Sequence, residues 1–398
     1  MTANAKLGWE KIEWARNHMP LQARIRGRFE RERPFRGLRV GVALHLEAKT
    51  AVLILTLQGG GAELWVMGSN PLSTQDEIVA ALGEVAGISV FARRGEPEEE
   101  RLARIADLLS FRPHLIIEDG GDIAWHLAGQ GEFPPELIGI CEETSTGVER
   151  LRTLAGEGRL GVPAIAVNDA SMKYLFDNRY GTGQSSWDAI MRATNLLIAG
   201  KTVLIVGYGW CGKGLALRAR GLGARVLVCE LDPVKAVEAV MEGLSVVELS
   251  AGMARADFVV TATGRRGVIG EEELQQAKDG QLLANAGHFG YEIDREALDR
   301  LAADRFPGRA GVEGYRFPDG RTVYLLGEGE LVNLALADGH PVEIMDVSFA
   351  LQALSAEHLV RHGRGLALGV HPVPPEIDRA VAESFLATVD GGGRPAVG

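Results

Sequence analysis

The sequence is poor in cysteine and has no long apolar runs. Its 398 residues include only three cysteines, Cys141, Cys211 and Cys229, and no CxxC pair. A disulfide framework or a zinc cage is therefore not expected, and a reducing compartment is. The longest apolar runs, such as 51–55 and 282–284, fall far short of the ~18 residues that span a membrane. Because residues 1–33 are also highly charged and carry no signal-peptide core, we expect a cytoplasmic protein.

Basic charge is scarce as well, whereas glycine is abundant. There are 42 Lys and Arg against 53 Asp and Glu, a net charge of −11. An acidic chain without a dense basic run is not expected to bind nucleic acid or an anionic membrane. Glycine supplies 51 of the 398 residues, nearly twice the usual ~7%. Such an excess indicates either linkers or backbone that must approach a ligand closely.

Short apolar strands alternate with helices along most of the chain. The first set runs from about 35 to 168, and the second begins at a helix predicted over 185–198. Strands are expected at 39–44, 62–68, 88–92, 202–206, 225–229, 258–261, 281–285 and 322–326, and further helices at 9–19, 48–58, 74–84 and 342–359. This alternation predicts an α/β fold of doubly wound, parallel sheets, and the length suits two or three domains.

A glycine motif follows the strand predicted at 202–206. Gly207, Gly209 and Gly212 form GxGxxG, and a helix is predicted directly after it. Here Gly207 would allow the tight turn, Gly209 the close approach of a pyrophosphate, and Gly212 the packing of helix on strand. The next strand ends at Glu230, whose carboxylate would accept ribose hydroxyls and repel a 2′-phosphate. The motif therefore predicts a Rossmann-type site for NAD rather than NADP.

Further polar motifs lie on both sides of the glycine motif. They are HLEAKT (45–50), NPLSTQD (70–76), EDGGD (118–122), EETSTG (142–147), NDASMKYLFDN (168–178), NAGHF (285–289) and NLALADGHP (333–341). In this order and spacing the chain, from about residue 40 to 386, resembles the S-adenosylhomocysteine hydrolase family. The resemblance implies cleavage of a purinyl homocysteine thioether to the nucleoside and L-homocysteine. NAD would oxidise the ribose 3′-hydroxyl, the thiolate would leave, water would add, and the ketone would be reduced again.

The resemblance also implies a role for each matching residue. Catalysis would fall on His45, Asp119, Glu143, Lys173, Asp177, Asn178 and His288. Within this set, Lys173 and Asp177 would handle the 3′-hydroxyl and Asp119 the C4′ proton. The substrate would contact Glu47, Lys49, Thr50, Ser73, Gln75 and His340. NAD would contact Thr144, Ser145, Thr146, Thr263, Asn285 and Asn333 besides the glycine motif and Glu230. No metal site is predicted.

Taken singly, these residues have ordinary explanations. Lys173 and Asp177 could be a solvated helix pair, and Asp119 could belong to a simple turn. The glycine motif also leaves open a dehydrogenase with net hydride transfer or a catalytically silent NAD-binding regulator. The joint pattern favours the hydrolase.

Four positions depart from the family pattern. Many members have Thr and then Glu or Gln where this chain has Glu47 and Lys49, Cys in place of Thr182, and Asp in place of Gly290. Lysine offers only donors, so Lys49 suits a 6-keto purine and predicts S-inosylhomocysteine as a substrate. The alternative is that Lys49 pairs with Glu47 or faces solvent and leaves adenine specificity intact.

The resemblance suggests a discontinuous domain plan. Residues 1–181 would begin the substrate domain, 182–340 would form the NAD domain, 341–390 would return to the substrate domain, and 391–398 would be a disordered tail. The crossings near 180–183 and 339–341 would be hinges for closure over the substrate. The family resemblance further implies a homo-oligomer, a tetramer or dimer, acting in the methionine cycle and one-carbon metabolism.

Overall fold

The computed structural model describes residues 2–389, so the predicted tail at 391–398 lies outside the described residues. The chain divides into two compact units. The first joins residues up to Tyr174 to those from Val342 onward, and the second spans Leu175–Pro341. The first crossing thus falls seven residues before the predicted end at 181. It lies inside a π-helical segment, η2 (Tyr174–Gly181), which no hydrophobic pattern indicates.

The first unit contains one sheet of seven parallel strands. They are β1 (Arg39–Leu44), β2 (Glu63–Gly68), β3 (Ile88–Phe91), β4 (Leu115–Glu118), β5 (Gly139–Glu142), β6 (Pro163–Ala166) and β15 (Gly369–Pro372). Their order is β15-β6-β5-β4-β1-β2-β3. The winding direction therefore reverses between β1 and β4, and ligands of such sheets bind at the carboxyl ends of the strands at this reversal.

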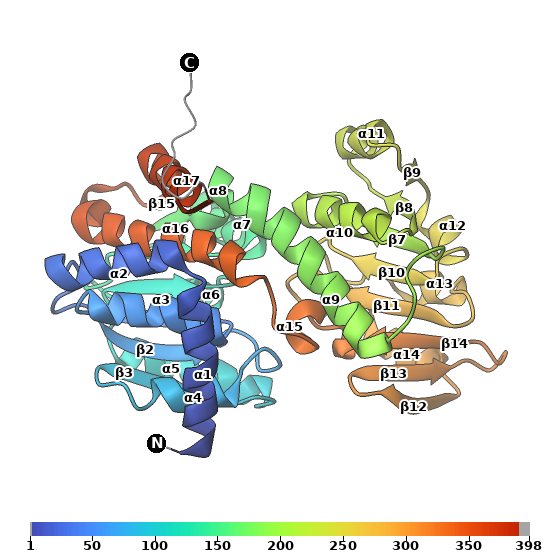
Figure 1. Cartoon of the computed structure of the whole chain (residues 1–398), viewed down its shortest axis with the longest axis horizontal. Coiled ribbons are helices and arrows are strands. Elements are labelled where there is room, and N and C mark those ends of the chain that lie inside the picture. Colours follow the sequence, from blue (N-terminus) through green and yellow to red (C-terminus); the bar gives the residue numbers. More distant parts are fainter. Residues whose placement is uncertain (1, 390–398) are drawn as a thin grey trace. The chain divides into compact units, whose positions relative to one another are not determined.

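Helices cover both faces of this sheet. They are α1 (Ala3–Asn17), α2 (Pro20–Glu32), α3 (Ala48–Gly59), α4 (Asp76–Leu82), α5 (Glu98–Ser110), α6 (Asp122–Gln130), α7 (Ser145–Gly156), α8 (Ser171–Lys173), α16 (Val342–His362) and α17 (Pro375–Val389). Because α3 is apolar on all sides, it is buried between the sheet and the neighbouring helices α2 and α16 (Figure 1). The short 3-10 turns η1 (Val167–Asp169) and η4 (Gly363–Gly365) complete the unit.

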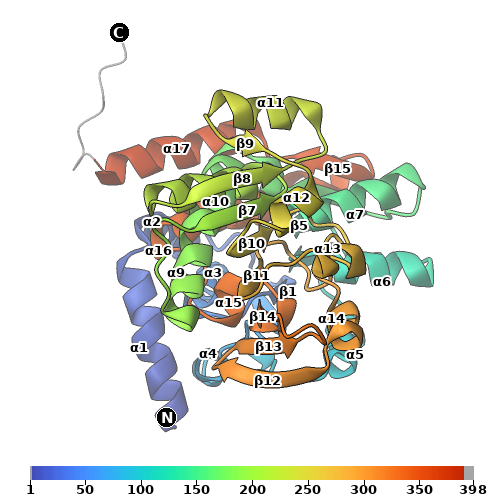
Figure 2. The same cartoon turned by 90° about the vertical axis from the view of Figure 1, so that its right-hand side faces the viewer.

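The second unit has an eight-stranded sheet, whose strands are stacked in Figure 2. It consists of β7 (Thr202–Val206), β8 (Arg225–Cys229), β9 (Ser245–Val246), β10 (Phe258–Thr261), β11 (Gln281–Asn285), β12 (Asp304–Arg309), β13 (Val312–Arg316) and β14 (Thr322–Leu326). The order is β12-β13-β14-β11-β10-β7-β8-β9. The prediction of a parallel sheet is wrong at one edge, where β12 and β13 are antiparallel. The winding direction reverses between β7 and β10.

The helices of the second unit are α9 (Thr182–Thr194), α10 (Trp210–Gly221), α11 (Pro233–Met241), α12 (Leu249–Met253), α13 (Glu271–Gln275), α14 (Arg295–Leu301) and α15 (Val332–Ala335), with the turn η3 (Gly327–Gly329). Helix α9 ends before the predicted residue 198 because Asn195 adopts the left-handed conformation, a common helix stop. The α/β fold class is confirmed. None of the described helices has the length and apolar character needed to cross a membrane.

Candidate active site

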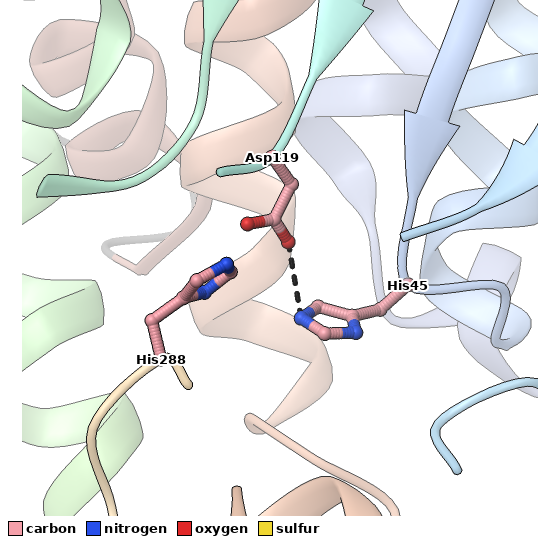
Figure 3. Close-up of side chains that lie close together, drawn as sticks. All are labelled: His45, Asp119 and His288. Atoms are coloured by element: carbon pink, nitrogen blue, oxygen red, sulfur yellow. Dashed lines mark ion pairs between the residues drawn. The ribbon is translucent and has the colours of Figure 1, made fainter. Parts of the chain in front are cut away.

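Two of the predicted catalytic residues meet where the first sheet reverses. His45 directly follows β1 and Asp119 directly follows the neighbouring strand β4. Figure 3 shows the His45 ring pointing at the Asp119 carboxylate, and Nε2 lies 3.0 Å from Oδ2. Asp119 is buried and His45 is half-buried. The register of two parallel strands therefore creates a histidine–carboxylate pair at the position expected for a ligand.

Ser73 orients the His45 ring through a hydrogen bond. Its hydroxyl donates to the carbonyl oxygen of Asn70 at 2.8 Å, so its oxygen accepts from Nδ1 of His45 at 2.7 Å. With Nδ1 acting as a donor, Nε2 faces the Asp119 carboxylate, which is a second acceptor. Nε2 and the carboxylate oxygen thus lie within hydrogen-bond distance, so a proton can pass between the two groups.

A second pair lies at the end of β5 in the same unit. Nζ of Lys173, in α8, lies 3.7 Å from Oε1 of Glu143, and both side chains are buried. The other carboxylate oxygen of Glu143 accepts a 2.5 Å bond from Nε2 of Gln352, which is fully buried in α16. This amide fixes the Glu143 carboxylate beside the ammonium group. The predictions did not include Gln352.

The motif at 45–50 forms the start of α3. Glu47 caps this helix by accepting from the backbone of Lys49 at 2.9 Å and of Thr50 at 3.3 Å. Nζ of Lys49 returns to the same carboxylate and lies 3.0 Å from Oε2. Thr50 donates its hydroxyl to the carbonyl oxygen of His45 at 2.6 Å. The structure thus contains the Lys49–Glu47 pair, with both side chains buried.

The remaining polar residues of this unit have mixed surroundings. Thr144 caps α7, and Ser145 bonds Asn168 at 3.2 Å. Thr146 lies half-buried in the first turn of α7. Gln75, predicted to bind substrate, accepts a hydrogen bond from Nζ of Lys11 at 3.2 Å.

The glycine loop of the second unit fits a dinucleotide. Gly207 has φ +95°, which a residue with a side chain rarely adopts, and a Cβ on Gly212 would lie 1.9 Å from the Gly207 carbonyl oxygen. A Cβ on Gly209 would meet nothing within 4 Å, so this side of the loop is open. The loop leads into α10, whose N-terminal N–H groups favour phosphate charge.

Glu230 is held at the end of β8 by the backbone. It accepts from the N–H of Tyr208 at 2.6 Å and from that of Asp232 at 2.8 Å. Since a carboxylate has about four acceptor sites, these two bonds orient Glu230 without exhausting it. A ribose hydroxyl pair fits the acceptor sites that remain.

Asn333 has a buried oxygen that fits a contact with NAD. Its Nδ2 donates to the Ser185 hydroxyl at 2.9 Å, and that hydroxyl donates to the carbonyl oxygen of Gly181 at 2.7 Å. Oδ1 of Asn333 is buried and accepts nothing from the described residues. An unsatisfied buried carbonyl is costly, and the amide N–H of a nicotinamide would satisfy it. Together with the glycine loop, this atom shows that the residues fit NAD.

The loops after β10 and β11 are joined by a residue that the predictions missed. Glu292, fully buried, accepts from the Thr263 backbone at 3.0 Å, the Thr263 hydroxyl at 2.7 Å and the Gly264 backbone at 2.7 Å. Burial raises the pKa of Glu292. Asn285 uses its amide within its own turn, where it accepts from Gly287 and donates to Phe289. These bonds hold the backbone of the turn from Asn285 to Phe289 in place.

His288 follows that turn, and its ring lies edge to face on Phe289 at 4.4 Å between centroids.

The π-helix η2 carries Asp177 and Asn178, both buried. Oδ1 of Asp177 lies 3.4 Å from Nδ1 of His340, and Nε2 of His340 lies 3.2 Å from the Thr182 hydroxyl. Thr182 thus takes part in a chain of polar contacts that ends on a predicted catalytic carboxylate. π-Helical segments are rare and frequently occur at functional sites.

Comparisons with known proteins agree with this geometry. The model of the S-adenosyl-L-homocysteine hydrolase family matches residues 2–133, and that of its NAD-binding domain matches residues 178–339. The chain is 54% identical to the S-inosyl-L-homocysteine hydrolase of Methanopyrus kandleri, over 97% of this chain and 91% of that protein. It is 52% identical to the adenosylhomocysteinase of Thermotoga maritima, over 95% and 94%. These matches confirm the predicted hydrolase class and the NAD cofactor. The chain belongs to the S-adenosyl-L-homocysteine hydrolase family.

Proposed function

We propose that the protein hydrolyses a purinyl homocysteine thioether and that S-inosyl-L-homocysteine is its preferred substrate. NAD, when bound, supplies a reversible acceptor for the hydride of the ribose 3′-carbon. Its binding falls to the glycine loop, which is open at Gly209, and to the acceptor sites that remain on Glu230 and Asn333. The products are the purine nucleoside and L-homocysteine.

The proton transfers fall to side chains that lie within reach of one another. Lys173 acts as the neutral amine, after its ammonium group has passed a proton to the neighbouring Glu143 carboxylate, and takes the proton of the 3′-hydroxyl. Asp119 removes the C4′ proton, which the neighbouring ketone acidifies, and the contact with His45 at 3.0 Å gives that proton a second site. The thiolate can then leave and be protonated by a histidine, for which His45 and His288 are the candidates.

The buried Lys49–Glu47 pair is the observation that carries the choice of purine. Hypoxanthine presents an acceptor, O6, beside a donor, N1–H, whereas adenine presents a donor beside an acceptor. An ammonium group next to a carboxylate matches the first pattern, because Lys49 can donate to O6 while Glu47 accepts from N1–H. Adenine would place its 6-amino group, a donor, against the ammonium group of Lys49, which also offers only donors. The Lys49–Glu47 pairing is also what the alternative with unchanged adenine specificity predicts. What supports the inosyl substrate is the order of donor and acceptor that the buried pair presents.

Overall identity does not separate the two activities. The S-inosyl-L-homocysteine hydrolase of Methanothermobacter thermautotrophicus and the adenosylhomocysteinase of Thermococcus kodakarensis are each 50% identical to this chain. The choice between the two substrates therefore rests on the side chains of Glu47 and Lys49. A mismatched buried polar group costs ~1–3 kcal/mol, so we expect about a 5- to 150-fold preference in kcat/KM for the inosyl thioether.

Thiol release from both thioethers tests the proposal. The wild type should prefer S-inosylhomocysteine, and the double variant Glu47→Thr with Lys49→Glu should reverse the preference. Lys6→Gln, on the exposed face of α1, changes the net charge by the same −1 and controls for it. An adenosyl preference of the wild type would overturn the purine assignment, and absence of thiol from both substrates would overturn the hydrolase. Release of reduced NAD during turnover would favour the dehydrogenase.

The setting of the reaction is part of the same proposal. The three cysteines are free thiols, which supports a reducing, cytoplasmic location. Homocysteine as a product supports a role in the methionine cycle and one-carbon metabolism. A homo-oligomer, a tetramer or dimer, is expected and can be checked by light scattering.

A further inference from the structure

Glu142, the last residue of β5, has an unusual set of partners. Its side chain is fully buried, and one oxygen, Oε1, accepts three hydrogen bonds. The donors are the Gly120 backbone at 3.0 Å, the Thr144 backbone at 3.0 Å and the Thr144 hydroxyl at 2.9 Å. Glu142 is not among the residues predicted for the site.

These bonds join two strand-end segments. The ladder between β4 and β5 ends with the backbone bond from Glu143 to the Glu118 carbonyl oxygen at 3.0 Å. Beyond it, only side chains can hold the two strand ends in register. Gly120 follows Asp119 directly, and Thr144 follows Glu143 directly. The Glu142 carboxylate thus connects the peptide after one candidate catalytic acid to the peptide after another.

The Gly120 peptide is held from both sides. Its N–H donates to Glu142, and its carbonyl oxygen accepts a 2.6 Å bond from Arg150. Gly147 makes room for the carboxylate, because a Cβ there would lie 2.1 Å from Cδ of Glu142. A small residue at 147 is thus a condition for this arrangement.

The stability of the fold does not explain why an acidic residue is buried at position 142. Burial raises the pKa of Glu142, and the nearby carboxyl groups of Glu118 and Asp119 raise it further. Its second oxygen, Oε2, is buried without a hydrogen-bond partner among the described residues. Unfavourable burial of this kind clusters at functional sites.

We infer that Glu142 is a positioning residue that holds Asp119 in line with the C4′ hydrogen by fixing the Gly120 peptide to Thr144. The inference rests on the proposed role of Asp119 as the base at C4′. It predicts that loosening the contact slows removal of the C4′ proton more than oxidation of the 3′-hydroxyl.

The two steps can be measured separately on the holoenzyme with inosine. Oxidation appears as the absorbance of reduced nicotinamide, and proton removal appears as deuterium entering C4′ in heavy water. For Glu142→Ala we expect C4′ exchange and thiol release to fall about 10- to 100-fold, because small misplacements of a catalytic group cost that much. Oxidation should fall less than about threefold. Glu142→Gln keeps an acceptor and should restore most of the exchange.

Gly147→Ala tests the same contact without altering Glu142. It should reproduce the loss of exchange, since the new methyl group displaces the carboxylate. Glu149→Ala, an exposed change in the same helix, is the matched control and should leave both steps unchanged. Thermal unfolding shows which variants are folded.

The outcomes separate the two proposals. Equal loss of oxidation and exchange in folded Glu142→Ala and Gly147→Ala, or normal exchange in both, would overturn the positioning role. Failure of Glu142→Gln to restore exchange would also count against it. If the wild type itself exchanges no C4′ hydrogen and releases no thiol, the proposed function fails instead.

Discussion

Nε2 of His45 lies 3.0 Å from Oδ2 of Asp119, while Nδ1 of the same ring lies 2.7 Å from the Ser73 hydroxyl. Ser73 therefore orients the ring that faces the candidate base. Removing the hydroxyl leaves Nδ1 without this acceptor and allows the ring to turn. An intramolecular hydrogen bond contributes ~0.5–1.5 kcal/mol, so Ser73→Ala should lower kcat for thiol release about two- to tenfold.

A matched serine controls for this change. Ser110→Ala, on the surface of α5, removes a hydroxyl that bonds only within its own helix, to Ala106. It should leave kcat within experimental error. If Ser73→Ala matched it, the Ser73 contact would have no part in orienting His45.

Glu230 predicts how the protein discriminates between NAD and NADP. Its carboxylate is fixed by the backbone of Tyr208 and Asp232, and its charge would repel a 2′-phosphate. Glu230→Gln keeps the shape and removes the charge. The ratio of the NADP to NAD dissociation constants should therefore fall about tenfold, equal to ~1.4 kcal/mol, as measured by calorimetry. Asp232→Asn changes an exposed acid two residues away and should alter the ratio little.

Strands at the centre of each sheet were predictable, whereas the edges were not. Residues 202–206, 258–261 and 281–285 form strands as predicted, because each is a short apolar run bounded by polar residues or glycine. Strand β12 contains Pro307 and Gly308 and is largely exposed, so no apolar pattern distinguishes it from a loop. Helix α2 carries alternating Arg and Glu, and its apolar face is too narrow to be read from sequence.

The same limit applies to the candidate site. His45 and Asp119 could be located because the motifs around them resemble those of the family, and both directly follow neighbouring parallel strands, at the edge where such sheets bind ligands. Gln352 could not, because it is one polar residue inside a helix and its partner, Glu143, lies 209 positions away. Glu292 likewise serves Thr263, 29 residues earlier, through a side-chain contact that no spacing predicts.

Glu292 predicts a stability effect in the second unit. Its carboxylate accepts from the backbone of both Thr263 and Gly264, so an amide at this position turns at least one bond into a donor facing a donor. Glu292→Gln should lower the free energy of unfolding by ~1–3 kcal/mol and weaken NAD binding. Denaturant unfolding with and without NAD measures both. Glu296→Gln, exposed in α14, is the control, and equal stability of the two variants would contradict the prediction.

Asp346 makes a pH-dependent contribution through a long-range helix cap. From α16 it accepts the backbone N–H groups of Leu21 and Gln22, each at 2.8 Å, at the start of α2, where Met19 offers no side-chain cap. Replacement by Ala should cost ~0.5–2 kcal/mol of stability, as for other helix caps, and replacement by Asn should cost less.

The sign of the pH effect follows from burial. Burial raises the pKa of Asp346 to about 6, above its ordinary value of 3.8. Between these two values the folded protein binds more protons than the unfolded chain, so the contribution of Asp346 declines as the pH rises through this window. The stability of the wild type relative to Asp346→Asn should therefore fall between about pH 4 and 6 and level off above it, as measured by urea unfolding at several pH values. A difference that stays constant, or that grows with pH, would show that the two backbone N–H groups outweigh burial at this carboxyl.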